Sequence, residues 1–239
     1  MLYSPADVSV IIPAVNEAEF LSACIRSAQL AGANEIIVSD GGSTDASCDI
    51  AASLGAIVVS GNSGRGPQQN AGVQKSTHPL LCFLHADCLL GRSSLETLCI
   101  VASQKEDLYA CFRQSIAAAG TKYRLLEIGN NMRVRWQKRP YGDQGICISR
   151  ALYQRVGGFE DVPFMEDVLL AGKLRQLSIA PCLLNDRIKV SPRRWQRSGV
   201  IRQTLKNWSL LRQLKRGRTP NELIEQYARD DEQRRGGSE

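Results

Sequence analysis

Apolar runs rich in β-branched residues alternate with helical patterns over the first 90 residues, and this alternation limits the fold more than any other feature. The runs are "VSVIIP" (8–13), "EIIVS" (35–39), "AIVVS" (56–60) and "LLCFL" (80–84). Continuous runs of this kind are typical of strands buried on both faces. Strands that alternate with helices predict a parallel α/β sheet with right-handed crossovers.

Ligands of such sheets bind outside the carboxyl ends of the strands. The residues to inspect are therefore those that directly follow each predicted strand. They are Pro13, Glu17, Asp40, Arg65, His85 and Asp87.

The second half predicts a mixture of helices and strands. We expect helices over 123–137 and in "MEDVLLAGKLRQL", and strands over 108–116 and in "QGICIS". "SIAPCLL" and "RIKVS" are expected to pair as an antiparallel edge, and Ser93-x-x-Glu96 is expected to form a capping box. We therefore predict one domain over 1–197, with a nucleotide-binding half (about 1–90) and an acceptor half (about 91–197). A basic helical extension follows over 198–239.

The composition indicates an ordinary globular chain of 239 residues with a net charge of +6. No signal-peptide pattern precedes the first strand, and no apolar run reaches the roughly 18 residues that a membrane-spanning helix needs. The eight cysteines lack a C-x-x-C pair and lie mostly in apolar contexts, which favours free thiols in a reducing compartment. We expect a cytoplasmic protein, with a peripheral position at the inner membrane face as the second option.

Positive charge is concentrated near the end of the chain. Eleven Lys or Arg residues and no acid lie between Arg187 and Arg218. This imbalance indicates an anionic partner: a diphosphate, an anionic lipid surface or nucleic acid. Leu205, Trp208 and Leu211 recur there at helical spacing, which fits either a core-packing helix or an interfacial one.

Several standard sites are absent from the sequence. The first strand is not followed by G-x-G-x-x-G, and there is neither a P-loop nor a G-x-S-x-G elbow. The strand ends carry carboxylates instead, each with a structural alternative. Asp40 before Gly-Gly suits an Asx turn, and Glu166 and Asp167 suit a helix N-terminus.

Asp87 is the carboxylate with the weakest structural alternative, because the next helix has its own predicted cap at Ser93. A carboxylate at this position suits Mg²⁺ or Mn²⁺, which one or two protein oxygens and substrate phosphates commonly hold. Glu17 and Asp40 are placed to accept hydrogen bonds from a base or ribose, and Arg65 to reach a phosphate.

Five segments carry a family resemblance: "VSVIIPAVNEAEFL", "IIVSDGGSTD", "GRGPQQNAG", "CFLHAD" and "GGFEDVPFMEDVLLAGKL". In order and spacing they resemble a family 2 glycosyltransferase of the GT-A fold. This fold is a Rossmann-like, mostly parallel sheet flanked by helices, here with a C-terminal helical extension. "GRGPQQN", "YGDQGI", "MEDV" and "SPRRW" resemble the small bacterial subgroup labelled arsenosugar-biosynthesis glycosyltransferases.

The resemblance implies roles on the donor side. Its implied donor nucleotide-binding residues are Pro13, Glu17, Asp40, Arg65 and Asn70. Asp87 would be the metal-binding last acid of the D-x-D motif. His85 stands where the family has the first acid, and it is a second candidate ligand.

The resemblance also implies roles on the catalytic and acceptor side. Asp167 would be the general base, with Glu166 beside it. "SPRRW" resembles the Q-x-x-R-W motif, with Ser191 in place of the glutamine. The implied acceptor or diphosphate residues are Arg193, Arg194 and Trp195, and we add Asp143 from "YGDQG".

The predicted function is transfer of a hexose from a nucleoside diphosphate sugar to an acceptor hydroxyl, inverting, metal-dependent and non-processive. The acceptor is an unidentified small molecule or lipid-linked compound, and an anionic membrane is a candidate peripheral contact. A nucleotidyltransferase is one alternative. A non-enzymatic polyanion-binding protein using residues 187–218 is the other, although acids at the strand ends oppose nucleic-acid binding there.

Overall fold

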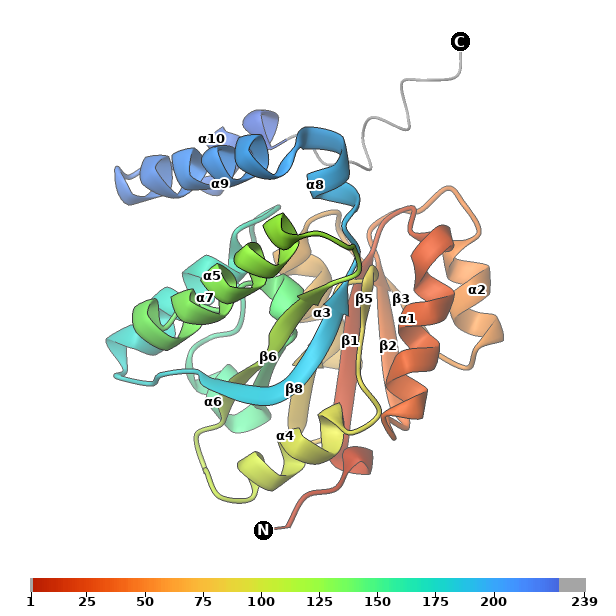
Figure 1. The fold of residues 1–239 in the computed structure, drawn as a ribbon. Coiled ribbons are helices and arrows are strands. Elements are labelled where there is room, and N and C mark those ends of the chain that lie inside the picture. The colour runs from red at the N-terminus through yellow and green to blue at the C-terminus, as the bar shows by residue number, and fades with distance from the viewer. Residues whose placement is uncertain (1, 228–239) are drawn as a thin grey trace.

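The computed structural model describes residues 2–227, which form one eight-stranded sheet covered by helices on both faces (Figure 1). The strands are β1 (Val8–Ala14), β2 (Glu35–Asp40), β3 (Ile57–Ser60), β4 (Leu80–Phe83), β5 (Cys88–Leu89), β6 (Tyr109–Ile116), β7 (Ile146–Ser149) and β8 (Cys182–Val190). The helices are α1 (Ala18–Leu30), α2 (Ser47–Ser53), α3 (Arg65–Lys75), α4 (Ser94–Ala102), α5 (Thr121–Gln137), α6 (Arg150–Arg155), α7 (Glu166–Gln176), α8 (Arg193–Ser198), α9 (Val200–Lys215) and α10 (Pro220–Leu223). Short 3₁₀ turns are η1 (Pro5–Asp7), η2 (Gly142–Gln144) and η3 (Ile224–Gln226).

The strand order is β3-β2-β1-β4-β7-β6-β8-β5. The first four strands are parallel, as the apolar runs predict. Strand β7 joins antiparallel to β4 and β6, and β5 joins antiparallel to β8. The mostly parallel, helix-flanked α/β sheet expected from the sequence is therefore confirmed.

Side chains of β1 alternate between the two faces of the sheet and form two cores. Val10 and Ile12 pack with residues of α1, α2 and α4 on one face. Ile11 packs with residues of α6 and α7, and with Val73 of α3, on the other face. A strand covered on both sides gains from apolar residues at every position, which explains the unbroken run in its sequence.

Two local expectations are wrong. "SIAPCLL" and "RIKVS" contribute to one strand, β8, which runs parallel to β6 with a register irregularity between Cys111 and Arg113. Ser93 precedes α4, but its hydroxyl donates to Asp186 and makes no capping bond. The hydroxyl of Ser93 therefore bonds to a carboxylate 93 residues away in the sequence instead of to the first turn of its own helix.

The chain after β8 returns over the carboxyl ends of the parallel strands. Figure 1 shows α8 and α9 at the same end of the molecule as α5 and α7. Leu210 of α9 and Leu223 of α10 are buried against Phe164. The predicted extension over 198–239 therefore packs on the sheet domain through its described part, and residues 228–239 lie outside the described residues. No helix within residues 2–227 is long and apolar enough to cross a membrane.

Candidate active site

A small cavity of about 40 Å³ lies at the carboxyl ends of β1 and β4, and we call it the inner cavity. The predicted residues that line it are Pro13, Glu17, Arg65, His85, Asp87, Arg193 and Arg194. They come from four separate segments of the chain. Most of the predicted donor-binding residues therefore lie together, as expected for residues that follow parallel strands.

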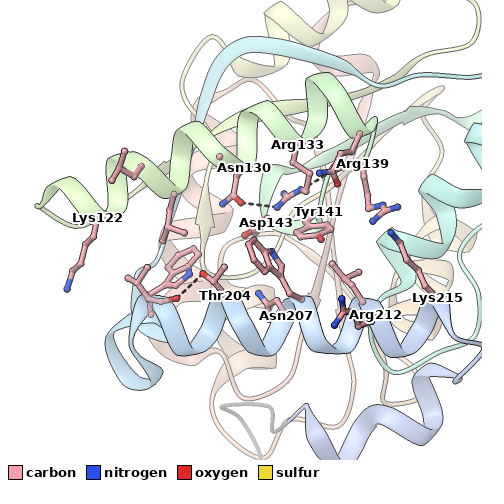
Figure 2. Close-up of a pocket in the computed structure, with 18 residues that line it drawn as sticks. Lys122, Asn130, Arg133, Arg139, Tyr141, Asp143, Thr204, Asn207, Arg212 and Lys215 are labelled. Carbon is pink, nitrogen blue, oxygen red and sulfur yellow. Dashed lines mark hydrogen bonds between the residues drawn. The ribbon is translucent and has the colours of Figure 1, made fainter.

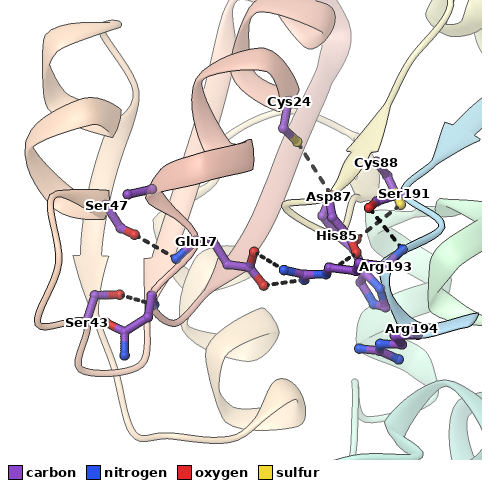
Figure 3. A network of polar contacts seen from close by, with 12 residues as sticks. Glu17, Cys24, Ser43, Ser47, His85, Asp87, Cys88, Ser191, Arg193 and Arg194 are labelled. Atoms are coloured by element: carbon purple, nitrogen blue, oxygen red, sulfur yellow. Dashed lines mark hydrogen bonds and ion pairs between the residues drawn. The ribbon is translucent and has the colours of Figure 1, made fainter. Parts of the chain in front are cut away.

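Arg193 is the centre of the inner cavity (Figure 3). Its two terminal nitrogens lie 2.8 and 2.6 Å from the carboxylate oxygens of Glu17, and its Nε lies 2.9 Å from Oδ2 of Asp87. The guanidinium also lies 4.8 Å from the centre of the Phe20 ring. One planar fork thus joins the ends of β1 and β4 to the start of α8, where all three side chains are largely shielded from water.

Two predicted donor residues are placed differently. The carboxylate of Asp40 accepts hydrogen bonds from the backbone of Gly42 and Ser43, which is the Asx turn that its sequence context allowed. Asn70 donates to the carbonyl of Phe159 and accepts from the hydroxyl of Tyr153. Neither residue lines the inner cavity, and their donor-binding role stays a prediction.

Gln68 lines the inner cavity and was not predicted from the sequence. Its Nε2 donates to the carbonyls of Ala14 and Ser39, each at 2.8 Å, and so fixes α3 against the ends of β1 and β2. A signal was present, because two glutamines near the start of a helix behind a glycine loop leave polar groups that need buried partners.

Asp167 lines a second cavity of about 110 Å³, which we call the middle cavity. Its Oδ2 accepts the backbone N–H of Gly142 at 2.7 Å, and its Oδ1 accepts the N–H of Val168. These two hydrogen bonds fix the orientation of both carboxylate oxygens. The left-handed backbone at Met165 (φ 62°) directs α7 so that Asp167 faces the cavity.

Glu166 differs from its neighbour, because it is buried and lines neither cavity. Its Oε1 accepts a hydrogen bond from Gln69 at 3.0 Å. Burial, reinforced by the charge of Asp167, raises the pKa of Glu166 to about 7. Adjacent acids are therefore separated into one that faces the cavity and one that is held inside the protein.

His85 lies between the inner and middle cavities and lines both. Gly142 is so close that a Cβ on this residue would lie 2.4 Å from Nε2 of His85. The glycine of "YGDQG" is therefore required for close approach of the imidazole, and the same residue supplies the N–H that Asp167 accepts.

Tyr227 closes the middle cavity from the C-terminal side and was not predicted. Its ring stacks on Phe164 at a centroid distance of 4.4 Å, and its hydroxyl accepts a hydrogen bond from Arg194 at 2.8 Å. Arg65 lies 6.0 Å from the ring centre. Two of the basic residues predicted to meet phosphates thus face a tyrosine.

A third cavity of about 680 Å³, the outer groove, lies between α5 and α9 (Figure 2). Trp195 lines it, as does Asp143, whose Oδ2 accepts a hydrogen bond from Gln114 at 2.7 Å. Burial raises the pKa of Asp143, although Arg133 opposes the shift. Asp143 and Tyr141 line the middle cavity as well, so the groove adjoins Asp167.

The three cavities form a series. Arg65, His85 and Arg194 line both the inner and the middle cavity, and Tyr141 and Asp143 line both the middle cavity and the groove. A carboxylate in the middle of such a series is positioned to receive a proton from a group entering on one side while a second ligand occupies the other.

The surroundings of Asp87 offer few protein ligands to a divalent cation. Residues 2–227 contain no group of three or more His, Cys, Asp or Glu side chains that could hold a metal ion. Mg²⁺ often has only one or two protein carboxylates and takes its other ligands from water and substrate phosphates. Asp87 is a hard oxygen ligand facing the inner cavity. Arg193 engages its Oδ2, so the site fits an ion that binds the other oxygen and depends on the substrate's phosphates.

Solved structures with a similar fold support the α/β architecture. The crystal structure of S. aureus TarS 1-349 is 17% identical, with a TM-score of 0.60 over 77% of this chain and 60% of that one. The same protein in complex with UDP-GlcNAc gives a TM-score of 0.60 at 17% identity, over 77% and 58% of the two chains. The mannosyltransferase PcManGT from Pyrobaculum calidifontis, in complex with GDP-Man and Mn²⁺, gives 0.59 at 19% identity, over 77% and 56%.

The chain thus spans about three fifths of the TarS 1-349 structure. Residues 9–157, more than half of the chain, match Glycosyl transferase family 2. This match covers the ends of β1 and β4 and the start of α3 at the inner cavity, and it ends before Arg193 and Arg194. The chain therefore belongs to glycosyl transferase family 2.

Proposed function

We propose that the protein transfers a sugar from a nucleoside diphosphate sugar to an acceptor hydroxyl with inversion, one sugar at a time. The observation that carries this proposal is the position of Asp167 in the middle cavity, between the inner cavity and the outer groove. Inversion requires attack from the face opposite the leaving group, so donor and acceptor must lie on opposite sides of the reacting carbon.

The donor is assigned to the strand ends around the inner cavity, which at about 40 Å³ holds a nucleotide only after Arg193 and Arg194 move aside. Glu17 and Pro13 lie where a base and ribose would meet the end of β1, and Arg65 and Arg194 lie where a diphosphate would meet guanidinium groups. Asp40 and Asn70 keep their proposed donor-binding role, and their side chains also hold the neighbouring loops through backbone groups. The nucleotide complexes of TarS and PcManGT support a nucleotide-sugar donor.

Asp167 is the proposed general base. Its hydrogen bond from Gly142 holds one oxygen in place, and the carboxylate accepts the proton of the acceptor hydroxyl as that oxygen attacks the anomeric carbon. Glu166 stays inside the protein and does not contact the acceptor; it supports the start of α7 through Gln69.

Asp87 would hold Mg²⁺ or Mn²⁺, with His85 beside it, and the ion would neutralise charge on the departing diphosphate. Arg193 keeps Asp87 and Glu17 oriented and adds positive charge at the same place. The Mn²⁺ in the PcManGT complex supports this assignment.

Two finer assignments belong to the same proposal. The sugar is a hexose, as in the UDP-GlcNAc and GDP-Man of the two similar structures. The subgroup is the bacterial one labelled arsenosugar-biosynthesis glycosyltransferases, which rests on "GRGPQQN", "YGDQGI", "MEDV" and "SPRRW" alone.

The decisive variant is Asp167→Asn, with the exposed Asp161→Asn in the preceding loop as its matched control. Loss of a positioned base lowers turnover by about 10² to 10⁴-fold. Nucleotide binding should be retained, because Asp167 does not line the inner cavity. Donor turnover and thermal shifts with nucleoside diphosphates and Mn²⁺ measure the two effects. Full activity of Asp167→Asn would exclude it as the base.

A further inference from the structure

The outer groove has the dimensions of a ligand site and opens onto the proposed base. Its volume of about 680 Å³ falls within the roughly 300–1,000 Å³ of small-molecule sites. It shares Tyr141 and Asp143 with the middle cavity, where Asp167 lies. A molecule in this groove can therefore present one end to the catalytic carboxylate.

The walls of the groove are apolar, with aromatic rings on one side. Leu125 and Leu126 of α5 face Trp195, Val200, Trp208 and Leu211. The same groove contains five cationic side chains, which are Lys122, Arg133, Arg139, Arg212 and Lys215 (Figure 2). The one acid in its lining, Asp143, is bonded to Gln114. The combination of apolar walls and cations suits an amphiphile with an anionic group.

One of the cations, Arg133, is fixed in place before any ligand binds. Arg133 lies 3.5 Å from the centre of the Tyr141 ring, and it donates to Asn130, Gln144 and the carbonyl of Arg139. Each of its nitrogens already donates a hydrogen bond, so Arg133 contributes a fixed positive charge to the groove. Five cations against one bonded acid suit the nearly two negative charges of a phosphate better than the single charge of a carboxylate, so the anionic group is assigned as a phosphate.

The exposed apolar side chains of the two helices, some of which also line the groove, distinguish a lipid from a water-soluble anion. Seven of the twelve exposed large apolar side chains in residues 2–227 lie on α5 and α9. Those on α5 are Leu125, Ile128, Met132 and Trp136, and those on α9 are Ile201, Leu205 and Trp208. Within each helix their spacing of three or four residues forms one stripe.

Acidic residues are almost absent from these two helices. α9 has none, and the single acid of α5, Glu127, is buried and paired with Arg124. Exposed apolar stripes with basic neighbours and no exposed acid are typical of helices that lie at an anionic lipid surface. Trp136 and Trp208, both largely exposed, are suited to the headgroup level.

Two other occupants fit the groove less well. The sequence beyond Tyr227, "ARDDEQRRGGSE", contains acids but no apolar residue larger than alanine, so it cannot cover the apolar walls. A second copy of the chain would bring the same cationic face against this one, and like charges repel.

We propose that the outer groove binds the acceptor, and that this acceptor is a lipid carrying both a phosphate and the hydroxyl group that Asp167 deprotonates, taken from an anionic membrane surface on which α5 and α9 dock. The inference rests on the proposed function for the identity of the ligand as acceptor. Binding of the lipid itself is independent of catalysis and is tested separately.

Vesicle flotation with the full chain tests the docking. We expect the protein to float with vesicles of phosphatidylcholine containing phosphatidic acid, and to stay unbound with phosphatidylcholine alone. Arg212→Ser with Lys215→Ser should weaken partitioning about thirtyfold, at ~1 kcal/mol per cation. The control pair, Arg26→Ser with Arg92→Ser, removes two exposed cations elsewhere and should change it little. Equal loss in both pairs, or no binding to the anionic vesicles, would overturn the proposal.

An apolar pair of variants separates a lipid surface from a general polyanion site. Leu125→Ser with Trp208→Ser should reduce partitioning at least about tenfold. Ile57→Ser with Ile100→Ser, also exposed but on β3 and α4, is the matched control. Unchanged partitioning of the Leu125 and Trp208 variant would mean that charge alone drives binding, and would reject the lipid. Thermal unfolding of each variant shows that it is folded.

A phosphatidic acid with a photoreactive tail tests occupancy of the groove. Crosslinks should include Trp195 or Leu211, which line the groove. Crosslinks confined to Ile128 and Ile201 would overturn the assignment, as would equal affinity for a water-soluble hexyl phosphate. A dimer in light scattering that the Leu125 and Trp208 variant abolishes would also overturn it. Thermal shifts with nucleoside diphosphates report on the donor site, so lost lipid binding with an intact donor shift leaves the proposed function standing.

Discussion

The inner cavity and the outer groove lie on either side of Asp167 and are built in opposite ways. The inner cavity is small, and its charges are already joined by Arg193, Glu17 and Asp87. The groove is large and apolar, and its lips carry largely exposed side chains such as Leu125 and Trp208. The difference teaches that the inner cavity is part of the folded core, whereas the lips of the outer groove add little to stability and are available for recognition.

Arg193→Met should have the largest effect on stability. It leaves the carboxylates of Glu17 and Asp87 close together without their shared cation, and breaking a buried pair of this kind costs about 3–5 kcal/mol. Urea unfolding measures the change in the free energy of unfolding. Arg202→Met, on the exposed part of α9, is the control and should cost less than about 0.5 kcal/mol. Equal losses in both variants would remove the contrast between the two regions.

Glu166→Gln should change how stability depends on pH. Burial raises the pKa of Glu166 from its ordinary 4.5 to about 7, so the folded protein prefers the protonated form. Its contribution to stability is complete below about pH 4.5 and is lost as the pH rises through about 7. The variant cannot ionise and keeps the hydrogen bond to Gln69, so it should gain at most about 3 kcal/mol over the native protein above pH 7.

Unfolding curves at pH 5 and pH 8 test this expectation. Asp161→Asn, whose carboxylate is exposed, should show the same pH dependence as the native protein. The gain in the free energy of unfolding should appear at pH 8 and be small at pH 5. If the difference between Glu166→Gln and the native protein were the same at both pH values, the fold would not raise the pKa of Glu166.

Trp208→Ser should have the smallest effect on stability. The side chain is 65% exposed, and surface substitutions of this kind change the free energy of unfolding by about 0.5 kcal/mol or less. Thermal and urea unfolding measure it, and Leu210→Ser on the buried side of α9 is the contrasting variant. A loss for Trp208→Ser as large as for Leu210→Ser would show that the groove is part of the core after all.

The parallel half of the sheet and most of the donor side followed from local sequence patterns. Buried strands have a clear signature, and their carboxyl ends must meet, so Glu17, Arg65 and Asp87 could be grouped without coordinates. What the sequence could not provide were contacts between distant segments. Arg193 reaches Glu17 across 176 residues, and no local pattern predicts that pairing.

The same reason explains the errors. Ser93 has the local signature of a helix cap, but Asp186 lies near it in the fold and accepts the hydrogen bond of its hydroxyl. The expected cap at Ser93 was the reason for excluding a capping role for Asp87, and that cap is absent. The position of Asp87 in the inner cavity does not depend on this reason. Tyr227 was not predicted because its stacking on Phe164 joins two distant segments, and the sequence near either residue has no pattern that indicates the contact.

Helix α8 is short, and it presents Arg193 to one ligand site and Trp195 to another within a single turn. A phosphate that draws Arg193 away from Glu17 and moves the short helix with it would also shift the ring that forms one wall of the groove. Donor and acceptor would then be thermodynamically linked, and each would change the affinity of the other by the same factor. Such a linkage favours an ordered sequence of binding, in which the nucleotide sugar enters first and completes the wall that the acceptor meets.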